Sequence, residues 1–280
     1  MSFTLSRTAP LRAGLASVPT LRALALPALR RLDRPIKIRH AYTGDPLDLL
    51  SYTHKGYWYY GRSREAATMQ RIANLVRPGD TVIEAGGHIG YVSQYLAKVV
   101  GDRGRVHVFE PGSKNSEFLS RNLSHLPQTL HIKAALSDHA GIQTFYEENI
   151  GGFMNSLDPS FVRDSQQGRR RVHELNITKH NINTLRLDDY ATRHNVTPQF
   201  LKIDVEGSER AVLFGAEKTL ARTPALMVEV SRDQAEIFEL LGGLEFRLSD
   251  ELGAPVTAPD QMHGNIFAEK QRRPSDAVPR

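Results

Sequence analysis

Buried strands alternate with helices through most of this chain, and that alternation constrains its fold more tightly than any other feature. Apolar runs predict strands at 81–85, 105–110, 130–136, 200–205 and 225–230, with short strands near 245–248 and 265–269. Helical periodicity lies between them, at 64–76, 89–100, 113–123 and 233–241. We therefore predict an α/β fold with a mostly parallel, seven-stranded sheet and helices on both faces. Ligands of such sheets bind beyond the carboxyl ends of the strands.

The strand predicted at 200–205 carries charges where a buried strand should be apolar. Lys202, Asp204 and Glu206 alternate in "FLKIDVEG", so their side chains share one face. Three desolvated charges would be costly unless partners or a ligand receive them. A structural ion pair would explain the pattern, and so would a binding site. The position at the ligand-bearing edge of the sheet favours the site.

A glycine-rich turn and an acid farther along the chain indicate a nucleotide-binding site. Gly86, Gly87 and Gly90 follow the strand at 81–85, where glycine lets the backbone approach a ligand, although plain turn chemistry also uses glycine there. Glu110 lies 20 residues past Gly90, where nucleotide-binding α/β folds place an acid for ribose hydroxyls. The glycine spacing is not the G-x-G-x-x-G of dinucleotide folds.

The form "E-x-G-G-x-x-G" resembles the first motif of class I S-adenosylmethionine-dependent methyltransferases, a Rossmann-like fold. The stretches "VIEAGGHIGYVS", "VHVFEPGSKNSEFLSRNL", "AALSDHAG", "TLRLDDY" and "FLKIDVEGSERAVLFGAEKTLARTPALMVEV" occur in the order found in the FkbM family of that class. The resemblance covers about residues 62–270. It departs from the family at His88, where the family usually has Asn, and this makes the charge near the cofactor depend on pH.

The resemblance implies which residues bind the cofactor, S-adenosyl-L-methionine. Glu84, before the glycines, would approach its methionine end. The full set of implied cofactor-binding residues is Glu84, Gly86, Gly87, His88, Gly90, Glu110, Leu136, Ser137 and Asp204.

The resemblance also implies O-methylation of a hydroxyl on a sugar, glycolipid or polyketide-type acceptor. An aliphatic hydroxyl is a poor nucleophile at neutral pH, so a side chain should accept its proton. We expect Asp204 in that role, with Glu206 next and Lys202 paired with one of them. Asn155 and Ser156 lie in the loop "NIGGFMNS", which is either acceptor-facing or a flexible connection.

Composition divides the chain into a basic extension at 1–60, a methyltransferase domain at 61–270 and a disordered tail at 271–280. The net charge is +5, and the stretch 1–32 has no acid and five arginines. It is interpreted as a poorly ordered extension, an amphipathic helix on an anionic membrane, or a transit peptide. We accordingly expect a cytoplasmic protein with possible peripheral membrane contact, or a mitochondrial one.

Other chemistries find less support. The chain has no cysteine, which excludes disulfides and thiolate metal sites, and its histidines show no metal-ligand spacing, so we assign no metal. Two rival hypotheses remain. One is a nicotinamide-dependent oxidoreductase on the same sheet. The other is a non-catalytic module that binds an anionic glycan, lipid or RNA through the basic leader and Arg169–Arg171, although no RNA motif supports a nucleic-acid partner.

Overall fold

The computed structural model describes residues 31–149, 151–161 and 176–270. The chain divides into two compact units, 1–64 and 65–280. The predicted tail at 271–280, most of the basic leader and the three arginines at 169–171 lie outside the described residues. Within the described part, no helix has both the length and the apolar character needed to cross a membrane.

The first unit contains a hairpin that the sequence analysis did not predict. Strand β1 (Pro35–Arg39) pairs antiparallel with β2 (Pro46–Leu50), and α3 (Lys55–Tyr59) and the 3-10 helix η2 (Gly61–Ser63) follow. Alternation in "PLDLL" places Leu47 and Leu49 in the interior. The segment after the hairpin is fixed by the Asp33 carboxylate, which accepts hydrogen bonds from the backbone N–H groups of Tyr52 and Thr53.

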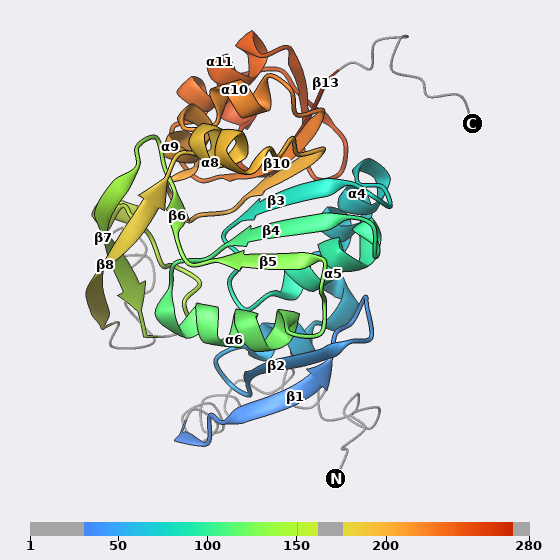
Figure 1. The fold of residues 1–280 in the computed structure, drawn as a ribbon, viewed down its shortest axis with the longest axis vertical. Coiled ribbons are helices and arrows are strands. Elements are labelled where there is room, and N and C mark those ends of the chain that lie inside the picture. Colours follow the sequence, from blue (N-terminus) through green and yellow to red (C-terminus); the bar gives the residue numbers. More distant parts are fainter. Residues whose placement is uncertain (1–30, 150, 162–175, 271–280) are drawn as a thin grey trace. The chain divides into compact units, whose positions relative to one another are not determined.

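The second unit is built on an eight-stranded sheet with the order β12-β11-β13-β10-β9-β3-β4-β5. Its five parallel strands are β3 (Thr81–Ala85), β4 (Arg105–Phe109), β5 (Thr129–Ile132), β9 (Phe200–Ile203) and β10 (Ala225–Val230). The antiparallel strands are β11 (Phe246–Ser249), β12 (Pro255–Val256) and β13 (Gly264–Lys270). The two-residue edge strand β12 makes the sheet one strand wider than predicted. Figure 1 shows β3, β4 and β5 side by side.

Helices cover both faces of this sheet, because its buried strands are apolar on both sides. The helices are α4 (Ala66–Leu75), α5 (Tyr91–Val100), α6 (Ser113–Leu123), α8 (Leu187–His194), α9 (Glu209–Phe214), α10 (Glu217–Leu220) and α11 (Gln234–Gly243), with a 3-10 turn η3 (Pro259–Gln261).

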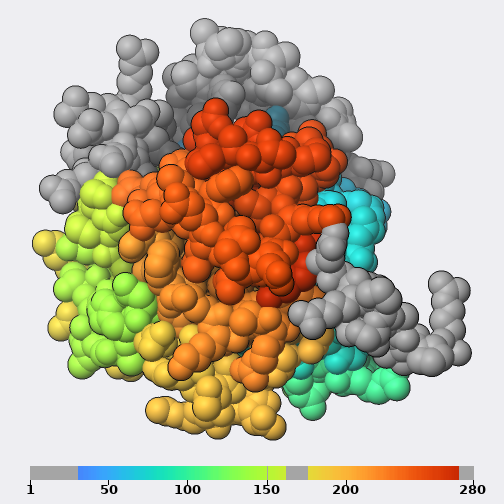
Figure 2. Space-filling model, turned by 90° about the horizontal axis from the view of Figure 1, so that it is seen from above, coloured from blue at the N-terminus to red at the C-terminus, as the bar shows by residue number. Residues whose placement is uncertain are grey.

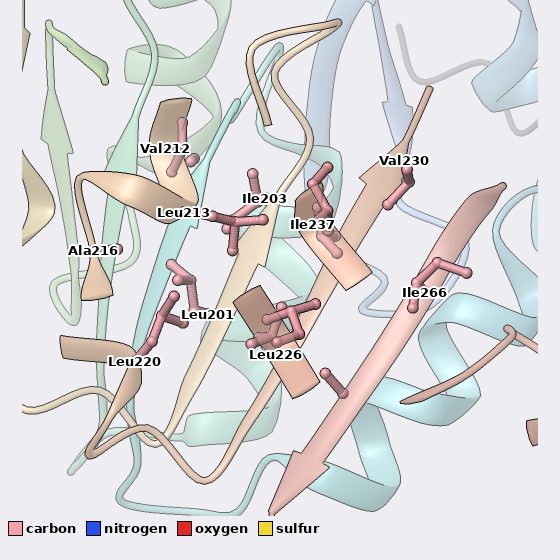
Figure 3. Close-up of a cluster of buried hydrophobic side chains, with 14 of the residues drawn as sticks. Leu201, Ile203, Val212, Leu213, Ala216, Leu220, Leu226, Val230, Ile237 and Ile266 are labelled. Atoms are coloured by element: carbon pink, nitrogen blue, oxygen red, sulfur yellow. The ribbon is translucent and has the colours of Figure 1, made fainter. Parts of the chain in front are cut away.

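Alternate residues of each strand enter two separate cores. Leu201 and Leu226 pack in a cluster with side chains of α8 to α11, which Figure 3 shows. Phe200 and Met227, one position away, pack in a second cluster with side chains of α4, α5 and α6. In the space-filling view the segments from β9 to β13, coloured orange to red, form one continuous face (Figure 2).

A second, three-stranded sheet has the order β6-β8-β7 and consists of β6 (Ala135–Leu136), β7 (Gly141–Glu148) and β8 (Ile177–Leu185). The strand predicted at 130–136 is therefore two strands, β5 and β6, in different sheets. The N-cap of α6 is Gly112, and Ser113 is the first residue of that helix. Asp188 of α8 caps the start of α10, because its carboxylate accepts from the backbone N–H groups of Lys218 and Thr219.

Candidate active site

The glycine turn after β3 is held so tightly that a side chain cannot be added to it. A Cβ at Gly86, whose φ is +85°, would lie 1.8 Å from the Asp204 carbonyl oxygen, and one at Gly87 would lie 2.3 Å from the Val108 side chain. The backbone N–H groups of Gly86 and Gly87 both donate to the carbonyl oxygen of Phe109. The turn is thus clamped between β4 and β9 and presents bare backbone beside both strand ends.

Glu110 follows β4 and is nearly fully buried, with 4% of its surface exposed. One carboxylate oxygen accepts the backbone N–H of His88 at 2.8 Å, and the other accepts that of Gly112 at 2.8 Å. Burial raises the pKa of this carboxyl to about 7, and these hydrogen bonds limit the rise. The sequence predicts Glu110 and His88 in one site, and a hydrogen bond joins them in the structure.

Lys202 lies inside the sheet because carboxylates surround it. Its Nζ is 3.0 Å from Asp204 Oδ2 and 3.4 Å from Glu84 Oε1, and it donates to the carbonyl oxygen of Gly86 at 3.2 Å. The expected pairing of Lys202 with a carboxylate is present. Burial alone would lower the pKa of Lys202, but Asp204 and Glu84 outweigh burial and raise it above its usual range.

The two carboxylates respond differently to this arrangement. Glu84 is completely buried, so desolvation raises its pKa although Lys202 and the Ser93 hydroxyl oppose the rise. The Asp204 side chain keeps 31% of its surface exposed. Desolvation acts against its charge, but Lys202 and a hydrogen bond with Glu229 together lower its pKa. Asp204 is therefore ionised at neutral pH.

Glu229 in β10 is a site residue that the sequence analysis missed. Met227 of β10 is in register with Lys202, so Glu229 comes level with Asp204 on the same face of the sheet. The negative charge of Asp204, together with burial, raises the pKa of Glu229 to about 10. The signal in the sequence was an acid at the penultimate position of the apolar run "ALMVEV".

Asp204, Glu206 and Glu229 form a carboxyl cluster, in which one oxygen from each residue lies within 4.8 Å of the others. Glu206 reaches it from a left-handed backbone conformation with φ +54°. Three carboxyl oxygens at this spacing could hold a metal ion, although the sequence analysis assigned none. The Lys202 ammonium beside Asp204 already supplies a positive charge there.

The loop at 151–156 is attached to both parts of the site. His88 Nε2 lies 2.8 Å from the carbonyl oxygen of Gly151, and the His88 ring packs on Phe153 with centroids 4.4 Å apart. At the other end Ser156 Oγ donates to the carbonyl oxygen of Glu206 at 2.6 Å. Ser156 is 1% exposed and its oxygen also accepts the backbone N–H of Asp158, so this hydroxyl is bonded on both sides within the chain, and its contact with an acceptor stays a prediction.

Two further residues predicted to bind the cofactor, Leu136 and Ser137, make contacts within the chain, and their role stays a prediction. The Leu136 side chain belongs to the buried hydrophobic cluster that also contains Phe109 and Leu187. Ser137 Oγ donates to Asp138, and the Ser137 backbone packs so closely on Gly215 that a Cβ there would meet its carbonyl oxygen at 2.0 Å. Neither side chain is brought to the Glu110 carboxylate by these contacts.

The sequence from the end of β3 to beyond β11, residues 84–254, matches the family model of the methyltransferase FkbM domain, which is more than half of the chain. The chain belongs to the FkbM methyltransferase family. It is an S-adenosylmethionine-dependent methyltransferase, with the α/β fold of that class.

Named relatives are similar over most of their length. The chain is 28% identical to the 31-O-demethyl-FK506 methyltransferase FkbM of Streptomyces tacrolimicus, over 67% of this chain and 80% of that protein. It is 23% identical to the 2-O-methyltransferase NoeI of Sinorhizobium fredii, over 61% and 70%. Among solved structures, Aeropyrum pernix fibrillarin in complex with S-adenosyl-L-methionine matches at 14% identity, with 84% of this chain and 82% of that chain covered and a TM-score of 0.42.

The residues of this FkbM-family site fit a nucleoside cofactor. Glu110 is a buried carboxylate held by two backbone donors at the end of β4, and the clamped turn beside it has no side chain at Gly86 or Gly87. Gly90 closes the turn with φ +89° and leads into α5. We expect Glu110 to hold the ribose hydroxyls, and the Glu84–Lys202–Asp204 row to lie at the methionine end.

Proposed function

We propose that this FkbM-family protein transfers a methyl group to a hydroxyl oxygen of a sugar, glycolipid or polyketide-type acceptor. Two relatives from different bacteria carry O-methyltransferase activities in their names, one on FK506 and one described as a 2-O-methyltransferase. An oxygen acceptor is common to both. A hydroxyl must lose its proton during the transfer, so the site needs a group that can take it.

The carboxyl cluster of Asp204, Glu206 and Glu229 is the observation that supports this proposal most directly. When bound, S-adenosylmethionine supplies an electrophilic methyl group, so the chain itself must mainly align the acceptor, exclude water and remove a proton. A carboxylate at the open end of β9 is within the reach of an acceptor, since Asp204 is only partly buried. We assign Asp204 as the proton acceptor and Glu206 as its neighbour in the same role.

Lys202 and Glu229 set the charge that Asp204 carries. Because Lys202 lowers the pKa of Asp204, this carboxylate is ionised at neutral pH but is a weak base on its own. Glu229, with a pKa of about 10, is protonated and hydrogen-bonded to it. Asp204 and Glu229 therefore hold one proton between them before an acceptor arrives. We infer that the carboxyl groups share the second proton, which makes the cluster a better acceptor than Asp204 alone.

Isotope labelling tests the acceptor class. Purified protein is incubated with methyl-¹³C S-adenosylmethionine and with glycan, lipid and polyketide extracts of cells that lack it, and labelled products are identified by mass spectrometry and NMR. The proposal expects a labelled methyl ether that survives alkaline hydrolysis, absent with the Asp204→Asn protein. A labelled methyl on nitrogen or sulfur, or an alkali-labile methyl ester, would rule out the hydroxyl acceptor.

The oxidoreductase hypothesis loses its basis with membership of a methyltransferase family. A direct comparison is simple, because any ligand that binds only the folded state raises the melting temperature. We expect a rise with S-adenosylmethionine or S-adenosylhomocysteine and no change with a nicotinamide dinucleotide.

A further inference from the structure

Asn155 carries a buried side-chain donor with no hydrogen-bond partner in the part of the chain that the structure describes. The residue is 8% exposed. Its Oδ1 accepts the backbone N–H of Glu148 at 2.9 Å, which fixes the orientation of the amide and directs Nδ2 to the other side. Among the described residues, Nδ2 makes no hydrogen bond. Buried polar groups are nearly always paired, so an unpaired one that is held in place needs an explanation such as a missing ligand.

The unpaired amide lies beside the Glu110 carboxylate. Both groups surround the position that a Cβ of Gly112 would occupy, with Glu110 Oε1 at 2.8 Å from that point and Asn155 Nδ2 at 2.9 Å. The amide does not hydrogen-bond the carboxylate directly. Asn115, on the same side, donates to Glu110 Oε1 at 3.4 Å and to the carbonyl oxygen of Gly152 at 3.2 Å, so it joins the loop to the same place.

A fixed acceptor and a fixed donor that lie close together without bonding each other select a particular kind of group. Glu110 has lone pairs left after its backbone bonds and can accept a proton donor, whereas Asn155 Nδ2 can only donate. A hydroxyl satisfies both at once, because its hydrogen is donated to the carboxylate while its oxygen accepts from the amide. A carbonyl, an ammonium or a methyl group satisfies at most one of the two.

We propose that Asn155 is a ribose-binding residue, whose side-chain amide donates to the oxygen of the same cofactor hydroxyl that Glu110 accepts. Asn155 then belongs to the cofactor half of the site rather than to the acceptor half, where the sequence analysis had placed it. The loop at 151–156 becomes a wall of the ribose site. This inference does not depend on the nature of the methyl acceptor.

The test is a thermodynamic cycle that combines removal of the Asn155 amide with removal of a cofactor hydroxyl, with each Kd measured by calorimetry. The wild-type and Asn155→Ala proteins are each titrated with S-adenosylhomocysteine and with its 2′-deoxy and 3′-deoxy analogues. Loss of one hydrogen bond should raise the Kd of the variant for S-adenosylhomocysteine by about 2- to 10-fold. For the analogue that lacks the contacted hydroxyl, the two proteins should bind equally well. Asn183→Ala removes an exposed asparagine of β8 and should change none of the values.

Two outcomes would overturn the proposal. An unchanged Kd for S-adenosylhomocysteine would mean that the amide meets only water. An equal loss for all three ligands would mean general damage to the loop. Should Asn155→Ala fail to fold, Gly112→Ala gives an independent test. Its backbone, at φ −60° and ψ 130°, accepts alanine, but the added methyl group would lie 2.8 Å from Glu110 Oε1 and 2.9 Å from Asn155 Nδ2 and would push these two groups apart. The Gly112→Ala variant should lose more affinity for S-adenosylhomocysteine than for the deoxy analogue that lacks the contacted hydroxyl. An equal loss of affinity for both ligands would contradict the assignment.

Discussion

Lys202 explains why a buried strand can end in acids. Glu84 of β3 is in register with Lys202 of β9, and Asp204 is the next residue along the same face. One ammonium therefore lies between two carboxylates. Removing one partner of a buried ion pair costs roughly 3–5 kcal/mol, so this row is a structural requirement as well as a source of charge. The charged face that the sequence displays is both the ion pair and the site edge.

The pKa of Glu110 gives a pH dependence to cofactor binding. With a pKa of about 7, the carboxyl is protonated below this pH and ionised above it. The ribose hydroxyls donate to the ionised form, so affinity should rise with pH. If only the ionised form binds, the Kd for S-adenosylhomocysteine should fall by about 10-fold from pH 6 to pH 8. Calorimetry in the presence of EDTA would measure this without metal.

Two variants distinguish a pH effect of Glu110 from one of the neighbouring His88 imidazole. Glu110→Gln should bind more weakly, by about 1.5–3 kcal/mol at pH 8, and its affinity should not change with pH. His88→Asn removes the imidazole whose backbone N–H bonds Glu110 and should keep the pH dependence. A flat profile in His88→Asn would assign the titration to His88 and not to Glu110.

The proton on Glu229 should respond to the charge of the cofactor. S-adenosylmethionine carries a sulfonium that S-adenosylhomocysteine lacks, and a positive charge near the carboxyl cluster lowers the pKa of Glu229. Binding of the methyl donor should therefore release more protons than binding of the product. Calorimetry in buffers with different ionisation enthalpies counts these protons. The difference should vanish in Glu229→Gln, and equal counts in the wild type would remove Glu229 from the site.

At the scale of elements, the sequence predicted the parts that carry their own periodicity. The predicted ranges of β3, α6 and β10 match the structure, because apolar pattern and flanking turn residues define them locally. The division of 130–136 into β5 and β6 could not be read from the sequence, since it depends on which sheet each half pairs with. Glu229 was missed for a related reason. Glu229 lies beside Asp204 because of the register between β10 and β9, and the sequence of one strand does not show that register.

The glycine turn gives a prediction at this scale. Gly86→Ala would place a methyl group against the backbone of Asp204, which cannot move without shifting β9, so we expect loss of several kcal/mol of stability or failure to fold. Gly242→Ala is the control, because nothing lies within 4 Å of that position in α11 and alanine favours a helix by up to about 1 kcal/mol. Urea unfolding of both variants should give opposite signs. A Gly86→Ala protein as stable as the wild type would contradict the clamped turn.

For the whole molecule, the sequence predicted the family and the cofactor, and the structure added the N-terminal hairpin. The order of motifs predicted the family and its cofactor, and the family match confirms both. The hairpin at 35–50 was not predicted, because two five-residue strands with mixed burial give a weak alternation signal. The proposed membrane contact of residues 1–32 stays a prediction. Truncation of that stretch with a vesicle-binding assay would test it.

In the proposed transfer, Asp204 receives the proton of the acceptor at the end of β9. The most direct test is the single-turnover rate of Asp204→Asn, with cofactor saturating and the labelled acceptor from the isotope experiment. The amide is nearly isosteric, and Lys202 keeps Glu84 as a partner. We predict a folded protein with near wild-type affinity for S-adenosylhomocysteine and a rate lower by roughly 10²- to 10⁴-fold, the usual contribution of general base catalysis. A folded, cofactor-binding Asp204→Asn protein with the wild-type rate would show that Asp204 is structural, and the proton would have to leave by another group.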